Sequence, residues 1–315
     1  MVNIKKVGII GLGNVGASIA FHLVQKDLFS EMVLVDINKA KAEGEAMDLS
    51  HGLPYSSPME IYSGEYKDLK DAAMIIITSG AAQKEGETRL DLINKNSKIL
   101  KSVIDNLNEV GIEGILLIVS NPVDVLTHFA IKYSGLPKER VFGSGTVLDT
   151  ARLKYLLAKK LNVDSRNVHT VIIGEHGDSE LAVNSISNVS GIPLKEFYEM
   201  KGFDRFEDTM NQIDEDVRMS AYEIIKKKGA TYYGIAMAVG KICQAVINDE
   251  KSMLPVSAEL DGEYYLNDLA LSVPCIVGKG GVEEILEMPL SVSERKQLQK
   301  SANEIKKVIE TIEQN

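Results

Sequence analysis

The chain has 315 residues, of which 44% are hydrophobic and 25% charged, as in an ordinary globular protein with room for two domains. Its 45 acidic and 35 basic side chains give a formal net charge of −10, which argues against nucleic acid and anionic membranes as partners. Two cysteines are too few for a disulfide framework or a cysteine metal site, and no run approaches the roughly 18 apolar residues of a membrane helix. We therefore expect a soluble, cytoplasmic protein without a bound metal.

The first half of the sequence alternates short apolar runs with longer segments in which apolar residues recur every three or four positions. The short runs predict strands at Lys6–Ile10, Met32–Ile37, Ala73–Thr78, Ile115–Val119 and Val141–Phe142. The longer segments predict helices at Val15–Lys26, Leu92–Val110 and Val123–Tyr133. Strands that alternate with helices favour a parallel sheet covered by helices on both faces, which is the α/β class.

The pattern changes after residue 147, where helical segments and β-like runs follow one another without regular alternation. This half predicts helices at Leu148–Leu161, Phe206–Lys227 and Tyr232–Val246, and strands at Val168–Ile173, Ala182–Val189 and Leu269–Val277. Ser291 and Glu294 form a capping-box pattern before a terminal helix with one apolar stripe. We therefore divide the chain into an α/β domain of residues 1–147 and an α+β domain of residues 148–315.

A glycine motif, Gly11-Leu-Gly13-Asn-Val-Gly16, directly follows the first expected strand and opens the first expected helix. Glycines at this spacing allow a tight turn and let a pyrophosphate approach the backbone at a helix N-terminus. Asp36 ends the second strand, where its carboxylate can accept hydrogen bonds from ribose hydroxyls and repel a 2′-phosphate. The set predicts a Rossmann-type, doubly wound sheet that binds NAD; the alternative is a glycine-rich turn in a sheet that binds nothing.

His176 is one of only five histidines, and it stands in a glycine-flanked turn after an apolar run. A histidine that only filled space in a hydrophobic core would not need glycines on both sides. Either His176 is an ordinary turn residue, or the glycines give a ligand access to its ring. Asp149 and Arg152 lie three residues apart at the start of an expected helix and hence on one face of it.

Three more polar residues follow expected strands of the first domain, at the sheet edge where such folds bind ligands. Gln83 and Arg89 lie in a glycine-containing loop after the third strand, and Asn121 follows the fourth. Taken singly, Arg89 and Arg152 are equally compatible with solvated surface positions, and Asp149 with an ordinary charge at the start of a helix.

Together, the arginines, the histidine and the aspartate specify one kind of reaction. An arginine fork suits a carboxylate, because it bonds both oxygens. A histidine beside an aspartate suits proton transfer, and an arginine on a closing loop can polarise a carbonyl group. With a nicotinamide added, the set describes hydride transfer between NAD and a small 2-hydroxy or 2-oxo acid.

These motifs resemble the lactate/malate dehydrogenase family over the length of the chain, from GLGNVGAS through VSNPVD, GSGTVLDTAR and GEHGDSE to KGATYYGIA. The resemblance implies that His176 is the proton donor and acceptor, that Asp149 is its partner and that Arg89 stabilises the transition state. It implies substrate contacts at Arg152, Gln83, Asn121 and Thr231. It further implies cofactor contacts at Gly11, Gly13, Val15, Gly16, Asp36, Lys41, Tyr66, Gly80, Ala81, Val119, Ser120, Asn121, Ser144 and Ile235.

The family divides on the residue at position 83. Relatives that act on malate carry arginine there, to pair with the second carboxylate of oxaloacetate, whereas relatives that act on lactate carry glutamine. Gln83, with the acidic Glu87 nearby, implies NAD-dependent interconversion of pyruvate and L-lactate, the terminal step of fermentative glycolysis. The alternatives are a dehydrogenase of larger L-2-hydroxy acids, a malate dehydrogenase and, outside the class, a catalytically silent NAD-binding protein.

The sequence departs from the family pattern at a few positions that leave the chemical residues untouched. Leu12 stands where a small residue is common, and Ala182 and Asn184 stand where relatives usually carry proline and tryptophan. These changes bear on the shape of the substrate pocket, and for that reason larger substrates stay among the alternatives.

The resemblance also implies a homotetramer. Because the chain begins a few residues before its first expected strand, we expect it to lack the N-terminal arm that braces vertebrate tetramers, so a dimer–tetramer equilibrium is the alternative. Many bacterial relatives are activated by fructose 1,6-bisphosphate, which an arginine and a histidine bind at a subunit interface. The matching positions are Lys154 and His169, which imply a weak effector site or two ordinary interface residues.

Overall fold

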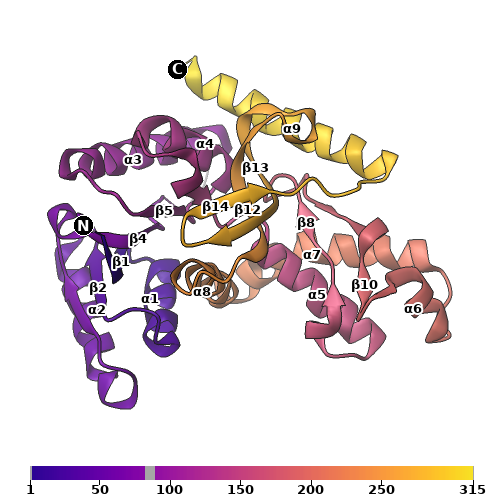
Figure 1. The fold of residues 1–315 in the computed structure, drawn as a ribbon, viewed down its shortest axis with the longest axis horizontal. Coiled ribbons are helices and arrows are strands. Elements are labelled where there is room, and N and C mark those ends of the chain that lie inside the picture. The colour runs from indigo at the N-terminus through magenta and orange to yellow at the C-terminus, as the bar shows by residue number, and fades with distance from the viewer. Residues whose placement is uncertain (1, 82–88, 315) are drawn as a thin grey trace.

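The computed structural model describes residues 2–81 and 89–314. Within these residues the central element is a nine-stranded sheet in the order β14-β13-β12-β6-β5-β4-β1-β2-β3 (Figure 1). Its parallel part consists of β1 (Asn3–Ile10), β2 (Glu31–Val35), β3 (Glu60–Ser63), β4 (Ala72–Ile77), β5 (Ile115–Ile118) and β6 (Val141–Gly143). This 3-2-1-4-5-6 order is that of the doubly wound dinucleotide-binding sheet. The α/β prediction for the first half is therefore confirmed.

Burial on both faces explains why these segments form central strands. All residues of β4 and β5 are buried, and their sequences, AAMIII and ILLI, contain no polar side chain. Only a strand covered by helices on both sides tolerates such a continuous apolar run. The covering helices of this half are α1 (Asn14–Lys26), α2 (Lys39–His51), α3 (Arg89–Val110) and α4 (Val123–Ser134).

Three strands from the second half extend the same sheet in the antiparallel direction. They are β12 (Ser252–Asp261), β13 (Asn267–Gly278) and β14 (Gly281–Ile285), and β12 meets β6 where Ser257 pairs with Gly143. The predicted strand at Leu269–Val277 is confirmed within β13. The sequence analysis did not predict β12, which pairs with β13 along most of its length.

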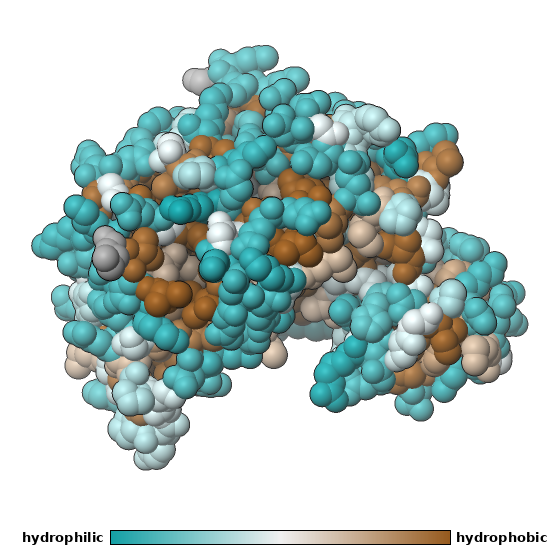
Figure 2. Space-filling view, in the orientation of Figure 1, coloured by the Kyte–Doolittle hydropathy of each residue, from teal (hydrophilic) through white to brown (hydrophobic). Residues whose placement is uncertain are grey.

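The rest of the second half forms a separate lobe with its own buried core (Figure 1). It contains α5 (Val147–Leu161), α6 (Leu194–Met200), α7 (Phe206–Lys228), β7 (Val168–His169), β10 (Asn188–Val189) and β11 (Ile192–Pro193). In the space-filling view the outline is notched between this lobe and the body of the molecule (Figure 2).

Two predicted strands of the second half are wrong as continuous elements. Val168–Ile173 divides into β7 and β8 (Ile172–Ile173), which belong to different sheets. Ala182–Val189 divides into β9 (Leu181–Ala182), a 3-10 turn and β10. Side chains of α5 explain the first break: the Thr150 hydroxyl accepts the N–H of Ile172 at 2.9 Å, and the Thr146 hydroxyl donates to its carbonyl at 2.6 Å.

Two further helices join the halves. Helix α8 (Tyr233–Ile247) packs against α1, and α9 (Val292–Glu313) follows the predicted capping box. Ser291 accepts the N–H of Glu294, whose carboxylate in turn accepts the N–H of Ser291, so this prediction is confirmed. None of the described helices combines the length and apolar character needed to cross a membrane.

Candidate active site

The glycine turn after β1 uses each glycine for a different reason. Gly11 has a φ of +94°, and a Cβ there would lie 2.6 Å from the backbone nitrogen of Ser79. A Cβ on Gly16 would lie 2.0 Å from the carbonyl oxygen of Gly11, so this glycine lets α1 pack closely on the turn. A Cβ on Gly13 would meet nothing within 4 Å. Gly13 therefore leaves open the space in front of the α1 N-terminus, where a pyrophosphate binds in this fold.

Asp36 lies directly after β2 and is fixed beside the glycine turn. Its carboxylate accepts the backbone N–H groups of Leu12, at 2.7 Å, and of Asn38, at 2.8 Å. A cavity of about 1150 Å³ opens here, and six of the predicted cofactor residues line it: Gly11, Gly13, Asp36, Lys41, Tyr66 and Gly80. The open space at Gly13, the uncapped start of α1 and the fixed carboxylate together fit a dinucleotide.

Other predicted cofactor residues support the cavity from behind or lie at its margins. Ser120 donates its hydroxyl to the Ser79 carbonyl at 2.6 Å, and Val119 and Ser144 are buried at the carboxyl ends of β5 and β6. Val15 and Ile235 are half-buried against the core. These five residues therefore do not line the cavity, and neither do Gly16, Ala81 and Asn121.

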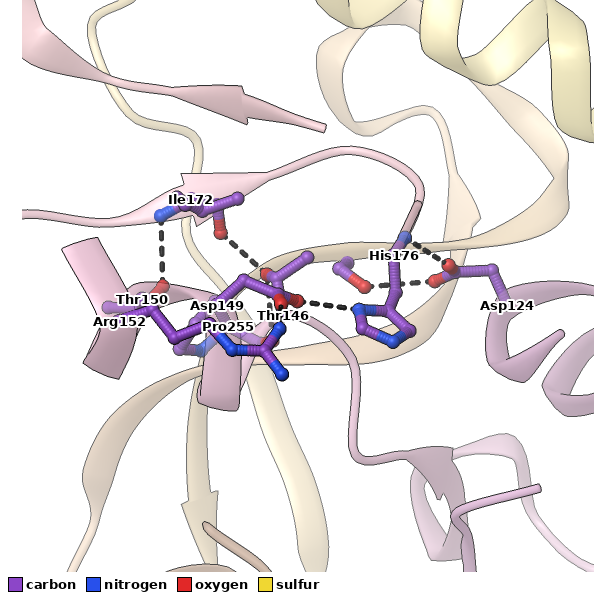
Figure 3. Close-up of polar contacts among 9 residues, drawn as sticks. Asp124, Thr146, Asp149, Thr150, Arg152, Ile172, His176 and Pro255 are labelled. Atoms are coloured by element: carbon purple, nitrogen blue, oxygen red, sulfur yellow. Dashed lines mark hydrogen bonds and ion pairs between the residues drawn. The ribbon is translucent and has the colours of Figure 1, made fainter. Parts of the chain in front are cut away.

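The second half builds a compact cluster around one buried carboxylate. Asp149, 1% exposed, accepts a hydrogen bond from Arg152 Nη1 on one oxygen and bonds His176 Nδ1 with the other, both at 2.6 Å (Figure 3). The His176 side chain is 26% exposed, and its second ring nitrogen points away from Asp149. The three residues that the sequence predicted to act together are therefore brought together.

Electrostatics favour the charged form of His176. Burial alone would lower the pKa of the imidazole, but the charge of Asp149 and its hydrogen bond outweigh this effect and, with Glu180 and Asp124, raise the pKa to about 9. Burial disfavours the ionised form of Asp149, yet His176 and Arg152 hold the pKa of this carboxyl below its usual value. At neutral pH the cluster therefore holds a carboxylate between two cations.

Asp124 is a functional residue that sequence reasoning missed. It lies in the second position of α4, is 1% exposed, and accepts the backbone N–H of His176 at 2.7 Å and the Ser272 hydroxyl at 2.9 Å (Figure 3). It thereby ties the histidine turn to α4 and β13. A charged residue followed by an apolar helical run is the one signal that could have found it, since such a carboxylate needs partners if it is buried.

Asn96 is a second residue of this kind. Its side-chain oxygen accepts the N–H of Ala81 at 2.8 Å, and its amide donates to the carbonyl of Asn121 at 2.8 Å. The side chain, 4% exposed, therefore joins the loops that follow β4 and β5. Both loops carry predicted cofactor or substrate residues, so Asn96 fixes their spacing.

The predicted substrate loop is only partly described. Gln83 and Glu87 lie outside the described residues, and Arg89 is the first residue of α3. Thr231 lies half-buried between α7 and α8 and forms no hydrogen bond with the described part of the cluster.

Within the described part of the chain, Asp149, His176 and Glu180 are the residues that bring carboxylate and imidazole atoms close enough, within 4.8 Å, to share a metal ion. Both oxygens of Asp149 are already bonded to cationic partners. A divalent ion would have to displace these bonds and would lie near the Arg152 charge. The cluster is therefore arranged for proton transfer rather than for holding a cation.

The two predicted effector residues line one cavity. Lys154 and His169 face a hollow of about 660 Å³ between α5, α8 and β12, together with Lys241. His169 is exposed, whereas Lys154 is half-buried, and burial lowers the pKa of its ammonium group.

A dinucleotide cradle and a proton-transfer pair on one chain define the class of nicotinamide-dependent dehydrogenases. A model of the NAD-binding domain of lactate/malate dehydrogenases matches residues 5–143, and a model of their α/β C-terminal domain matches residues 146–315. The chain belongs to the lactate/malate dehydrogenase family, and its cofactor is NAD.

Individual relatives cover the whole chain. An L-lactate dehydrogenase of Thermoanaerobacter sp. is 50% identical over 309 residues, which span 98% of this chain and 99% of the relative. An L-lactate dehydrogenase of Acetivibrio thermocellus is 49% identical over 310 residues and 98% of both chains. The crystal structure of a lactate dehydrogenase enzyme from a Medee basin deep-sea metagenome library superposes with a TM-score of 0.96 at 46% identity, over 99% of this chain and 100% of that one.

Proposed function

We propose that this protein is an NAD-dependent L-lactate dehydrogenase that interconverts pyruvate and L-lactate. The observation that carries the proposal is the shared carboxylate of Asp149, which holds His176 and Arg152 at 2.6 Å each. This arrangement places a proton donor and a carboxylate-binding cation side by side, as a small 2-oxo acid requires. Membership of the family and the names of the relatives support the same function.

We assign a different role in the reaction to each residue of the cluster. Arg152 binds the substrate carboxylate with its planar fork and so orients the carbonyl group toward His176. The free ring nitrogen of His176 donates a proton to the carbonyl oxygen during reduction and accepts it from the hydroxyl group during oxidation. NAD, when bound, supplies or accepts the hydride at the neighbouring carbon. Asp149 fixes the tautomer of the ring and balances its positive charge.

The raised pKa of His176 sets the pH dependence. Its value of about 9 means that the imidazole is protonated at neutral pH, ready to donate. Pyruvate reduction should therefore be fully supported below this pKa and lost as the pH rises through it. Lactate oxidation requires the neutral imidazole and should rise over the same interval.

The remaining site residues are proposed from the family pattern. Arg89 polarises the substrate carbonyl, and Gln83 keeps the pocket for the substrate side chain neutral. Asn121 and Thr231 contact substrate, and Ile235 packs against the nicotinamide. The other proposed cofactor contacts are Gly11, Gly13, Val15, Gly16, Asp36, Lys41, Tyr66, Gly80, Ala81, Val119, Ser120 and Ser144.

We further propose a division into a dinucleotide-binding domain of residues 1–147 and a catalytic domain of residues 148–315, in a cytoplasmic homotetramer. The free, buried cysteines Cys243 and Cys275 are consistent with a reducing compartment. Phe21 on α1 and Met237 on α8 are 58% and 63% exposed on two helices that pack together. A contact with another subunit would cover these two exposed apolar side chains.

Fructose 1,6-bisphosphate is proposed as a weak effector at the cavity of Lys154 and His169. Both line the same hollow, and Lys154 lies two residues after Arg152 on α5. An anion bound there would thus contact the helix that carries Arg152, on a different face from the catalytic cluster. A lysine lacks the two-pronged fork that suits phosphate, and a histidine contributes charge only when protonated, so the site should be weak at neutral pH.

Replacing His176 with asparagine should lower pyruvate reduction by about 10²–10⁴-fold, the usual size of a general acid effect. NADH binding should change little, because the cradle lies in the other half of the chain. Steady-state kinetics and NADH fluorescence titration measure the two effects. His51→Asn, at an exposed position in the last turn of α2, is the matched control. Near-normal turnover of His176→Asn would remove the role assigned to this residue.

Gln83→Arg should move substrate preference from pyruvate toward oxaloacetate by at least a few kcal/mol of transition-state binding, through a charge-assisted pair with the second carboxylate. The ratio of kcat/KM is measured by NADH oxidation with pyruvate, oxaloacetate and 2-oxoisocaproate in parallel. The unmodified enzyme should prefer pyruvate. Gln297→Arg, at an exposed position of α9, controls for the added charge. An unchanged ratio in Gln83→Arg would show that this residue does not face the substrate.

The effector proposal has its own test, pyruvate saturation with and without fructose 1,6-bisphosphate. Activation should be slight at neutral pH and larger near about pH 5.5–6, because histidine side chains in general gain positive charge as the pH falls. Lys154→Arg should respond more strongly, since its guanidinium binds phosphate with two parallel bonds. Strong activation of the unmodified enzyme at neutral pH and micromolar effector would show that Lys154 suffices. No response from Lys154→Arg at either pH would show that the site does not exist.

A further inference from the structure

Glu180 is a buried acid that the mechanism above does not use. It ends the histidine turn, directly before β9, and is 8% exposed. Its backbone N–H donates to the Gly177 carbonyl at 3.1 Å, but none of the residues in 2–81 and 89–314 donates a hydrogen bond to its carboxylate. A carboxyl group in this position is costly to ionise, because burial removes water and none of the described side chains donates a hydrogen bond in its place.

Charged groups from several elements surround this carboxyl group. One of its oxygens, one oxygen of Asp149 and one ring nitrogen of His176 all lie within 4.8 Å of one another. Arg152 on α5 and Arg218 on α7 also act on it electrostatically. Two carboxylates so close together in a buried site do not both ionise readily.

Hydrogen bonds decide which of the two carboxyl groups carries the negative charge. Asp149 receives charge-assisted bonds from His176 and Arg152, whereas the side chains that the structure describes donate none to Glu180. Burial and the charge of Asp149 therefore outweigh the opposing effects of His176, Arg152 and Arg218, and raise the pKa of Glu180 to about 8. At neutral pH, Asp149 is ionised and Glu180 is neutral.

We propose that Glu180 is a positioning residue that extends the pH range over which His176 keeps its proton. As the pH rises, Glu180 releases its proton to solvent before His176 does. The new negative charge lies close to the imidazolium and stabilises it. This proposal rests on the proposed function in one respect only, namely that the enzyme uses the His176 proton to reduce its substrate.

Glu180→Gln tests this role, because glutamine keeps the size of the side chain but cannot ionise. NMR titration of isotope-labelled histidines measures the pKa of His176 directly, with its signal assigned by its absence from His176→Asn. This pKa should fall by about one unit relative to the unmodified protein, as expected for the loss of a nearby opposite charge. The alkaline limb of kcat/KM for pyruvate should shift down in pH by the same amount.

Asp214→Asn is the matched control. Asp214 is a half-buried acid on α7 whose pKa burial raises to about 6, and it bonds Asn184 rather than the cluster. This variant should leave both the His176 titration and the alkaline limb in place.

An unchanged pKa of His176 in Glu180→Gln would overturn the proposal, as would an equal shift in Asp214→Asn. A lower melting temperature and a lower plateau rate with an unmoved limb would indicate a structural role and also overturn it. If the unmodified protein fails to reduce pyruvate, the proposed function fails, but the His176 titrations of the two proteins still decide the role of Glu180.

Discussion

The site depends on the two hydrogen bonds of the buried Asp149 carboxylate, because one of its oxygens bonds His176 and the other bonds Arg152. His176 needs it for its tautomer and its raised pKa, and Arg152 needs it for its position. A buried ion pair is stable only when both charges stay compensated, and loss of one partner typically destabilises a protein by about 3–5 kcal/mol. The three residues therefore form one unit, and a change in any of them disturbs the other two.

The fold holds this unit from several directions. Thr146 and Thr150 fasten the start of α5 to the backbone of Ile172, and Asp124 holds the backbone of His176 from α4. From α9, the Ser301 hydroxyl accepts the N–H of Glu175, the residue before the histidine. These ties come from segments far apart in the sequence. They restrict the histidine turn to one position, so a substrate meets a site that is already formed.

The glycine turn and the Asp149–Arg152 pair could be predicted from local spacing in the sequence, whereas the pairing of His176 with Asp149 followed from the resemblance to the dehydrogenase family. The glycine turn follows a strand and opens a helix, and Asp149 and Arg152 lie one turn apart on a helix. The apolar helical run after Asp124 indicates that this residue is buried, but its bond to the backbone of His176 could not be predicted, since that turn lies 52 residues further along the chain. Glu180 was missed for a similar reason: only the folded chain shows that it is buried beside another carboxylate.

In the fold, too, the elements that a local sequence pattern determines could be predicted, and those that depend on distant contacts could not. Continuous apolar runs identify β1, β2, β4, β5 and β6, because burial on both faces leaves one kind of sequence, whereas the edge strand β3 has no such run and was not predicted. The break between β7 and β8 depends on hydroxyl groups at the start of α5, and the joining of β12 to β6 depends on a partner more than a hundred residues away. Neither contact leaves a pattern in the local sequence.

The shared carboxylate is tested most directly by the kinetics of Asp149→Asn, in which the amide keeps the shape of the side chain and loses its charge. We expect kcat/KM for pyruvate to fall by about 10²–10⁴-fold, because the ring loses its tautomer partner and its compensating charge. The KM for pyruvate should rise, since Arg152 loses its anchor. A folded Asp149→Asn enzyme that reduces pyruvate at nearly the original rate and with the original KM would contradict the central role of this carboxylate.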